Sequence, residues 1–162
     1  MDPKTKVYEL LRSFSTTMLV TTARGHRPKA RPMQIVSVEE GGDISFLTSI
    51  HGVIAEEVTS NPGVLLVLQN ERSAYLSVRG IATVRQDPGR VQELWKEAYQ
   101  VWFPMGVDDP DLALLTVRPV SAEYWDNRGL NRLEYIFEAA KAYLKGGRPA
   151  FGDSDQHAKT SL

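Results

Sequence analysis

The chain lacks several features that would mark a functional class. It has no cysteine, which excludes disulfides, thiol nucleophiles and thiolate metal sites. Its 19 basic and 20 acidic residues leave a net charge of -1, which argues against broad electrostatic binding to nucleic acid or to an anionic membrane. No apolar run approaches the roughly 18 residues of a membrane span, and the charged N-terminus does not resemble a secretory signal. We therefore expect a cytoplasmic protein.

Recognisable catalytic equipment is also scarce. None of the three histidines, His26, His51 and His157, has a second histidine or a carboxylate at metal-ligand spacing, so we expect no protein-built metal site. The sequence shows neither a glycine-rich phosphate loop nor a nucleophile elbow. The adjacent carboxylates Glu56-Glu57 and Asp108-Asp109 are more typical of solvated surface than of an acid–base pair. No catalytic residue can be named, and any chemistry would come from a borrowed cofactor.

What the sequence does contain is a clear β-hairpin between Thr16 and Val38. Two extended stretches flank Arg24-Gly25-His26, where glycine favours a tight turn. The second stretch carries Lys29 and Arg31 just before its apolar part, a reasonable place to hold an anion. Two isolated basic residues are more often solvated charges on an edge strand. The residues alone leave both readings open.

Further elements are short and mostly extended. A helix begins at Asp2-Pro3, because a capping carboxylate precedes a proline at the first helical position. A turn at 40–43 leads to a strand at 44–48, and a short helix lies between 49 and 61. The apolar run 64–68 predicts a strand buried on both faces, and Gly80 predicts a bulge or a tight bend in the strand after it. Strands joined by short turns predict a mainly β, antiparallel barrel with short helices.

The second half of the chain begins with another cap and proline, Asp87-Pro88. An apolar stripe follows at helical spacing, and its tryptophans favour a subunit interface; its members are Val91, Leu94, Trp95, Ala98 and Trp102. Two closing strands are expected at 112–120 and 122–125, and a last amphipathic helix at 133–144. We expect one domain over 1–145 and a polar, flexible tail over 146–162.

Several segments together resemble the general-stress-protein branch of the pyridoxamine 5′-phosphate oxidase-like flavoproteins. Their order and spacing cover about residues 5 to 150. The matching segments are Ala30-Arg31-Pro32-Met33, Phe46-Leu47-Thr48-Ser49, Glu56-Glu57-Val58 with Asn61-Pro62, Tyr75-Leu76-Ser77-Val78-Arg79-Gly80, Glu93-Leu94-Trp95, Trp102-Phe103-Pro104, Asp108-Asp109-Pro110-Asp111-Leu112 and Glu123-Tyr124-Trp125-Asp126.

The resemblance implies an antiparallel split β-barrel that forms a homodimer and binds FMN at the subunit interface. It assigns Arg31 to the flavin phosphate, because a guanidinium makes paired charge-assisted hydrogen bonds. It places Thr48 and Ser49 at the phosphate or ribityl chain, and Tyr75 near the ring or ribityl. The remaining implied contacts are Pro32, Met33, Gln34 and Ile35 along the ring, and Trp102 and Phe103 reaching across from the other subunit.

The sequence departs from the family at one position. The family usually has a lysine at the start of the short helix, where it holds the phosphate, and here that lysine falls on Ile54. Only His51 offers partial positive charge nearby. Loss of one charge-assisted contact costs about 1.5–3 kcal/mol, which corresponds to roughly a tenfold to hundredfold loss of affinity.

The function implied is that of an FMN-dependent oxidoreductase linked to stress response. Two alternatives stay open: a flavin-binding or flavin-sensing protein without turnover, and a dimeric barrel that binds another planar ligand such as haem. The sequence lacks the substrate-phosphate residues that pyridoxamine phosphate oxidation would need, so that activity is not expected.

Overall fold

The computed structural model describes residues 2–70, 74–126 and 157–162. Their elements, in chain order, are α1 (Pro3–Ser13), β1 (Thr16–Ala23), β2 (Arg27–Gln34), β3 (Ser37–Val38), β4 (Ile44–Ser49), α2 (Val53–Ser60), β5 (Gly63–Gln69), β6 (Ala74–Arg85), α3 (Pro88–Leu94), the 3₁₀ helices η1 (Glu97–Val101) and η2 (Gly106–Asp108), β7 (Leu112–Asp126) and β8 (His157–Ser161).

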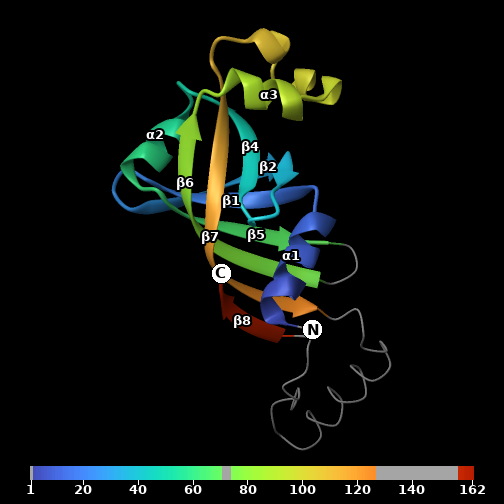
Figure 1. Cartoon of the computed structure of the whole chain (residues 1–162). Helices are drawn as coiled ribbons and strands as arrows, with labels where there is room; N and C mark the ends of the chain where they lie inside the picture. The colour runs from blue at the N-terminus through green and yellow to red at the C-terminus, as the bar shows by residue number, and fades with distance from the viewer. Residues whose placement is uncertain (1, 71–73, 127–156) are drawn as a thin grey trace, which may run out of the picture.

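All strands belong to one antiparallel sheet in the order β2-β1-β5-β6-β7-β4-β3, and β8 also pairs with β7 (Figure 1). The sheet curves around a core that α1 closes with Val7, Leu10 and Leu11, all fully buried. The two outer strands of the order do not pair with each other among the described residues. This confirms the expected fold, an antiparallel split barrel with short helices.

Local signals explain the first half of the chain. Asp2 accepts a hydrogen bond from the Thr5 backbone and caps α1 before the proline, as expected. The β1–β2 hairpin turns at Gly25 and His26, which have φ of 77° and 58°. A positive φ is available to glycine at little cost, and histidine adopts it next to a glycine in such tight turns. The hairpin places Arg31 opposite Leu19 and Lys29 opposite Thr21.

Gly80 marks the bulge that the sequence predicts. The β6–β7 register shifts between Arg79 and Gly80. A Cβ at position 80 would lie 2.6 Å from the Arg118 carbonyl oxygen and 2.6 Å from Val117 Cγ1. Only glycine lets the two strands approach so closely while β6 bends.

Three expectations need correction. Strand β5 is not buried on both faces: its burial alternates, and Val67 is 42% exposed, because the other face of the sheet is open. The tryptophan stripe does not lie on one helix, because α3 ends at Leu94 and Trp95 has an extended backbone before η1. The two closing strands form a single strand, β7, of 15 residues.

The last residues of the tail expected to be flexible over 146–162 form a strand. Residues 157–161 form β8 on the edge of β7, and Leu162 packs against the main core. Its paired backbone and the partly buried Leu162 attach this segment to the sheet and the core. The helix expected at 133–144 lies outside the described residues, and the domain boundary near 145 stays a prediction.

Candidate functional site

A cavity of about 360 Å³ opens between β2, β4, the start of α2 and the segment that follows η1. We call it the β2–β4 cavity. Its size lies in the range of small-molecule sites, about 300–1,000 Å³. Its walls are predominantly apolar; the lining residues are Thr16, Pro32, Met33, Gln34, Val36, Leu47, Thr48, Ser49, Ile54, Tyr99, Trp102 and Phe103.

Strand β2 supplies one wall through Pro32, Met33 and Gln34. Strand alternation turns Met33 toward the core, where it packs on buried residues, while Pro32 and Gln34 stay exposed. Strand β4 supplies the facing wall with Leu47, Thr48 and Ser49. A flat ligand between these walls would meet apolar side chains and strand edges rather than charged groups.

The far wall is aromatic. Trp95 packs edge-to-face on Tyr99 at 5.9 Å between ring centroids and lies 6.5 Å from Phe103. This cluster fixes Tyr99, which is 3% exposed, against the cavity. Trp102 also lines the cavity yet is 70% exposed, so the described residues leave most of its side chain uncovered. An exposed aromatic ring at a cavity mouth suits stacking on a planar ligand.

The polar end of the cavity lies where β4 passes into α2. Ser49 Oγ accepts a hydrogen bond from the His51 N–H at 3.2 Å and keeps its own hydrogen for donation. Helix α2 begins at an N-cap glycine, Gly52, without a side-chain cap. Its first N–H groups are therefore open to an acceptor at this end. None of the described lining residues is charged.

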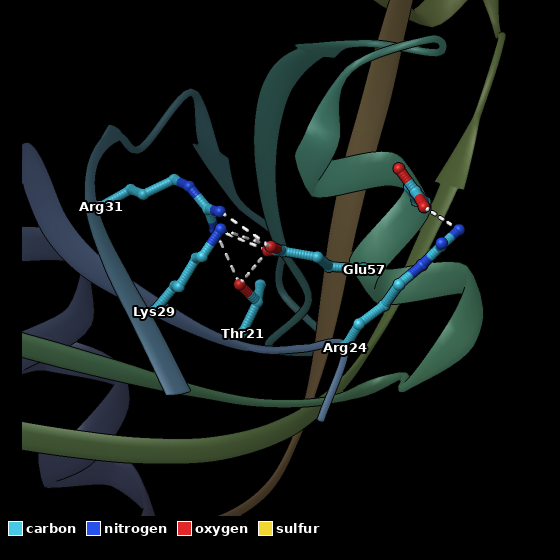
Figure 2. Close-up of polar contacts among 6 residues, drawn as sticks. Thr21, Arg24, Lys29, Arg31 and Glu57 are labelled. Carbon is cyan, nitrogen blue, oxygen red and sulfur yellow. Dashed lines mark hydrogen bonds and ion pairs between the residues drawn. The ribbon is translucent and has the colours of Figure 1, made fainter. Parts of the chain in front are cut away.

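Arg31 is not among the lining residues, because it binds Glu57 of α2 (Figure 2). Its Nη1 donates to Glu57 Oε2 at 2.8 Å and its Nη2 to Oε1 at 3.0 Å. Thr21 accepts from the same Nη1 at 2.8 Å and donates to Glu57 Oε2 at 2.6 Å. Lys29 Nζ approaches Glu57 Oε1 at 3.6 Å. We call these four residues the Glu57 cluster.

The Glu57 cluster corrects the expectation that Glu56-Glu57 is solvated surface. Glu56 is exposed and pairs with Arg24, but Glu57 is 7% exposed. The hydrogen bonds from Arg31, then the bond from Thr21 and the charges of Arg31 and Lys29, lower the pKa of Glu57 to about 2 against the cost of burial. The carboxylate is thus ionised at neutral pH and holds both nearby cations.

The structure brings together seven of the residues that the resemblance assigned to a cofactor: Pro32, Met33, Gln34, Thr48, Ser49, Trp102 and Phe103. Trp102 and Phe103 line the cavity of their own chain. The cavity lining does not include Arg31, Ile35, His51 or Tyr75. Ile35 packs on the core, His51 is exposed with its Nε2 3.7 Å from Asp111 Oδ1, and Tyr75 is a partly exposed residue of β6 opposite Trp125. These assignments stay predictions.

Sequence reasoning missed Thr16, Val36, Leu47 and Tyr99 as lining residues. Leu47 stood within a matching segment, so its position could have been proposed. Tyr99 was left out of the apolar stripe from Val91 to Trp102, although on a helix it would lie one turn after Trp95, at the edge of the same face. Among the described residues no group of three or more potential ligands could hold a metal ion. No helix there is long and apolar enough to cross a membrane.

Comparison with solved structures gives several relatives of the same fold. A general stress family protein of Xanthomonas campestris pv. campestris is 30% identical, with 81% of this chain and 92% of that chain covered, at a TM-score of 0.62. The general stress FMN/FAD binding protein of Xanthomonas citri is 29% identical, with 78% and 89% covered and a TM-score of 0.65. A Jannaschia protein described as general stress protein 26 covers 99% of both chains at 24% identity and a TM-score of 0.72.

No curated protein sequence matches this chain significantly. The model of the pyridoxamine 5′-phosphate oxidase-like family, in contrast, matches residues 2–150. That range contains both cavity walls and the Glu57 cluster. Together with the general stress relatives, the match identifies the chain as a member of the pyridoxamine 5′-phosphate oxidase-like family, on its general stress protein branch.

Proposed function

We propose that this protein binds a flavin, with FMN as the cofactor, in the β2–β4 cavity. The observation that carries the proposal is the cavity itself: a slot of about 360 Å³ between two strand walls, closed by an aromatic cluster and polar only at the β4–α2 end. A relative of the same branch is described as an FMN/FAD binding protein. A flavin matches this cavity, because its planar, weakly polar ring suits the apolar walls and its polar chain suits the polar end.

The ring would lie along Pro32, Met33 and Gln34 and stack on Trp102 and Phe103. Thr48 and Ser49 would donate hydrogen bonds to the ribityl chain or phosphate, beside the open N–H groups of α2. When bound, the flavin supplies electron-transfer chemistry, and we propose that the protein is an oxidoreductase of this type. The chain's own part is to bind and orient the ring and to exclude water from its buried face.

We further propose that the protein is a homodimer. The outer face of the sheet carries large apolar side chains that are each 38–42% exposed: Met18, Val67, Tyr75 and Trp125. Met18 pairs with Val67, and Tyr75 with Trp125, so the patch runs across β1, β5, β6 and β7. Large exposed apolar side chains gathered on one face of neighbouring strands are typical of a subunit interface. Tyr75 then belongs to the interface rather than to the cavity of its own chain.

An absorbance spectrum of the purified protein after addition of FMN and removal of free flavin tests the cofactor. Retained flavin bands support the proposal, a Soret band would indicate haem instead, and a bare protein spectrum would refute cofactor binding. Reduction of the bound flavin by NADH or NADPH would establish turnover. Retained flavin that neither nucleotide reduces would favour a binding or sensing role.

A further inference from the structure

The charges around the β2–β4 cavity do not suit a phosphate. A flavin phosphate carries about two negative charges near neutral pH, and burying it requires cations or many N–H donors. No described lining residue is charged, and Ile54 occupies the lining position nearest the start of α2. What that end of the cavity offers is two hydroxyl groups and the N-terminus of a two-turn helix.

Basic residues of the β1–β2 hairpin gather at a different hollow. Lys29 lines a separate hollow of about 290 Å³ with Ala23, Arg24, Arg27, Val53, Glu56 and Glu57. Helix α2 separates the two spaces, because Val53 and Glu57 line this hollow while Ile54 lines the β2–β4 cavity. Both cations of the Glu57 cluster, Lys29 and Arg31, point to the carboxylate of Glu57 (Figure 2). Of these two cations, only Lys29 lines the hollow.

Glu57 occupies the place that an anionic ligand would take on Arg31. It uses both terminal nitrogens of the guanidinium at 2.8 and 3.0 Å, the bidentate geometry that a phosphate would need. Thr21 of β1 adds a hydrogen bond to each partner: it donates to Glu57 Oε2 and accepts from Arg31 Nη1. A phosphate that took Arg31 would remove the main partner of a buried carboxylate and leave it only Thr21 and the more distant Lys29, which is strongly unfavourable.

From this geometry we infer that the cavity recognises the ring and ribityl chain of a flavin and gives its phosphate little net binding energy, so that the unphosphorylated flavin, riboflavin, binds nearly as well as FMN. The inference rests on the proposed function. A helix N-terminus strengthens the binding of an anion by only about two- to fivefold, whereas a cation at the phosphate strengthens it by about ten- to hundredfold. We therefore expect FMN to bind more tightly than riboflavin by less than about tenfold.

Equilibrium dialysis of the full chain against FMN and against riboflavin measures the two dissociation constants directly. In the wild type their ratio should stay below about tenfold, and Arg31→Ala should change both constants by the same factor. A preference for FMN above about thirtyfold, or an Arg31→Ala variant that weakens only FMN, would overturn the inference. Absence of binding by either flavin would instead refute the proposed function.

A cation placed in the cavity should create the missing preference. Ile54→Lys is expected to raise the preference for FMN by about tenfold or more. Val53→Lys is the matched control, since it adds the same charge one residue away on the exposed side of α2. At about 0.15 M salt it should leave the ratio nearly unchanged. Equal ratios in both variants, with melting temperatures showing both folded, would contradict the inference.

Discussion

The Glu57 cluster makes a sharp prediction about stability. Its carboxylate has a pKa of about 2 in the folded protein against an ordinary value of 4.5, mainly because Arg31 donates to it. At about 1.4 kcal/mol for each pH unit, this difference corresponds to about 3 kcal/mol of folding free energy. Because the folded pKa is the lower one, this stability is fully present above about pH 4.5 and is lost as the pH falls toward 2.

Glu57→Gln removes the charge while keeping the size of the side chain. We expect it to lower the free energy of unfolding by about 3 kcal/mol near pH 7, and the gap to the wild type should close progressively below pH 4.5. Urea unfolding followed by tryptophan fluorescence, at several pH values and one protein concentration, measures both quantities.

Glu56→Gln is the control for Glu57→Gln. Glu56 is the neighbouring residue and also pairs with an arginine at 2.7 Å, but both partners are exposed. Its loss should cost less than about 1 kcal/mol. A gap between wild type and Glu57→Gln that matches this control, or that is the same near pH 7 and near pH 3, would refute the role given to Glu57.

Three further predictions concern the bulge, the cavity mouth and the outer face of the sheet. Gly80→Ala should destabilise the fold by about 1–3 kcal/mol because its Cβ meets the Arg118 carbonyl oxygen, whereas Gly63→Ala, which has open space, should be nearly neutral; equal effects in urea unfolding would contradict this. Trp102→Ala should weaken flavin binding by about two- to tenfold in a titration. Met105 is equally exposed but does not line the cavity, so Met105→Ala should leave the affinity unchanged. Similar losses of affinity in both variants would contradict a contact between Trp102 and the flavin. Val67→Glu should turn a dimer into a monomer in sedimentation, while Val101→Glu should not; a wild type that is already monomeric would refute the interface.

Much of the fold follows from local chemistry that the sequence displays. The cap and proline at Asp2-Pro3 begin α1, and the turn at Gly25 fixes the β1–β2 hairpin. Both signals depend only on residues that are close in the sequence, so they can be recognised without knowledge of the tertiary structure. Gly80 could be interpreted as a bulge for the same reason, although its cause, the close approach of β7, depends on a strand more than thirty residues later in the chain.

Contacts between residues far apart in the sequence determine two features of the fold that were predicted incorrectly. The run 64–68 looks suited to burial on both faces, yet β5 lies in a sheet whose outer face is open in the single chain. The stripe from Val91 to Trp102 fits a helix, but the edge-to-face contact of Trp95 with Tyr99 accompanies a break in the helix. In both places tertiary contacts outweigh periodicity.

The candidate site also has one part that the sequence could predict and one part that it could not. The strand segments around Pro32 and Thr48 line one cavity, because strand pairing sets their positions, and their contact with a flavin stays a prediction. The partner of Arg31 was not predictable, since Glu57 is 26 residues away and its neighbour Glu56 is an ordinary surface residue. Nothing in a single sequence distinguishes the buried member of such a pair from the exposed one.

Binding of a flavin ring in the β2–β4 cavity is tested most directly by blocking the cavity. Gln34→Trp adds a large side chain at an exposed lining position, and Ala30→Trp adds the same side chain on the same face of β2 outside the cavity. Equilibrium dialysis against FMN should show one flavin bound per chain for the wild type and Ala30→Trp, and a loss of affinity of at least about tenfold for Gln34→Trp. Undiminished binding by folded Gln34→Trp would contradict the account.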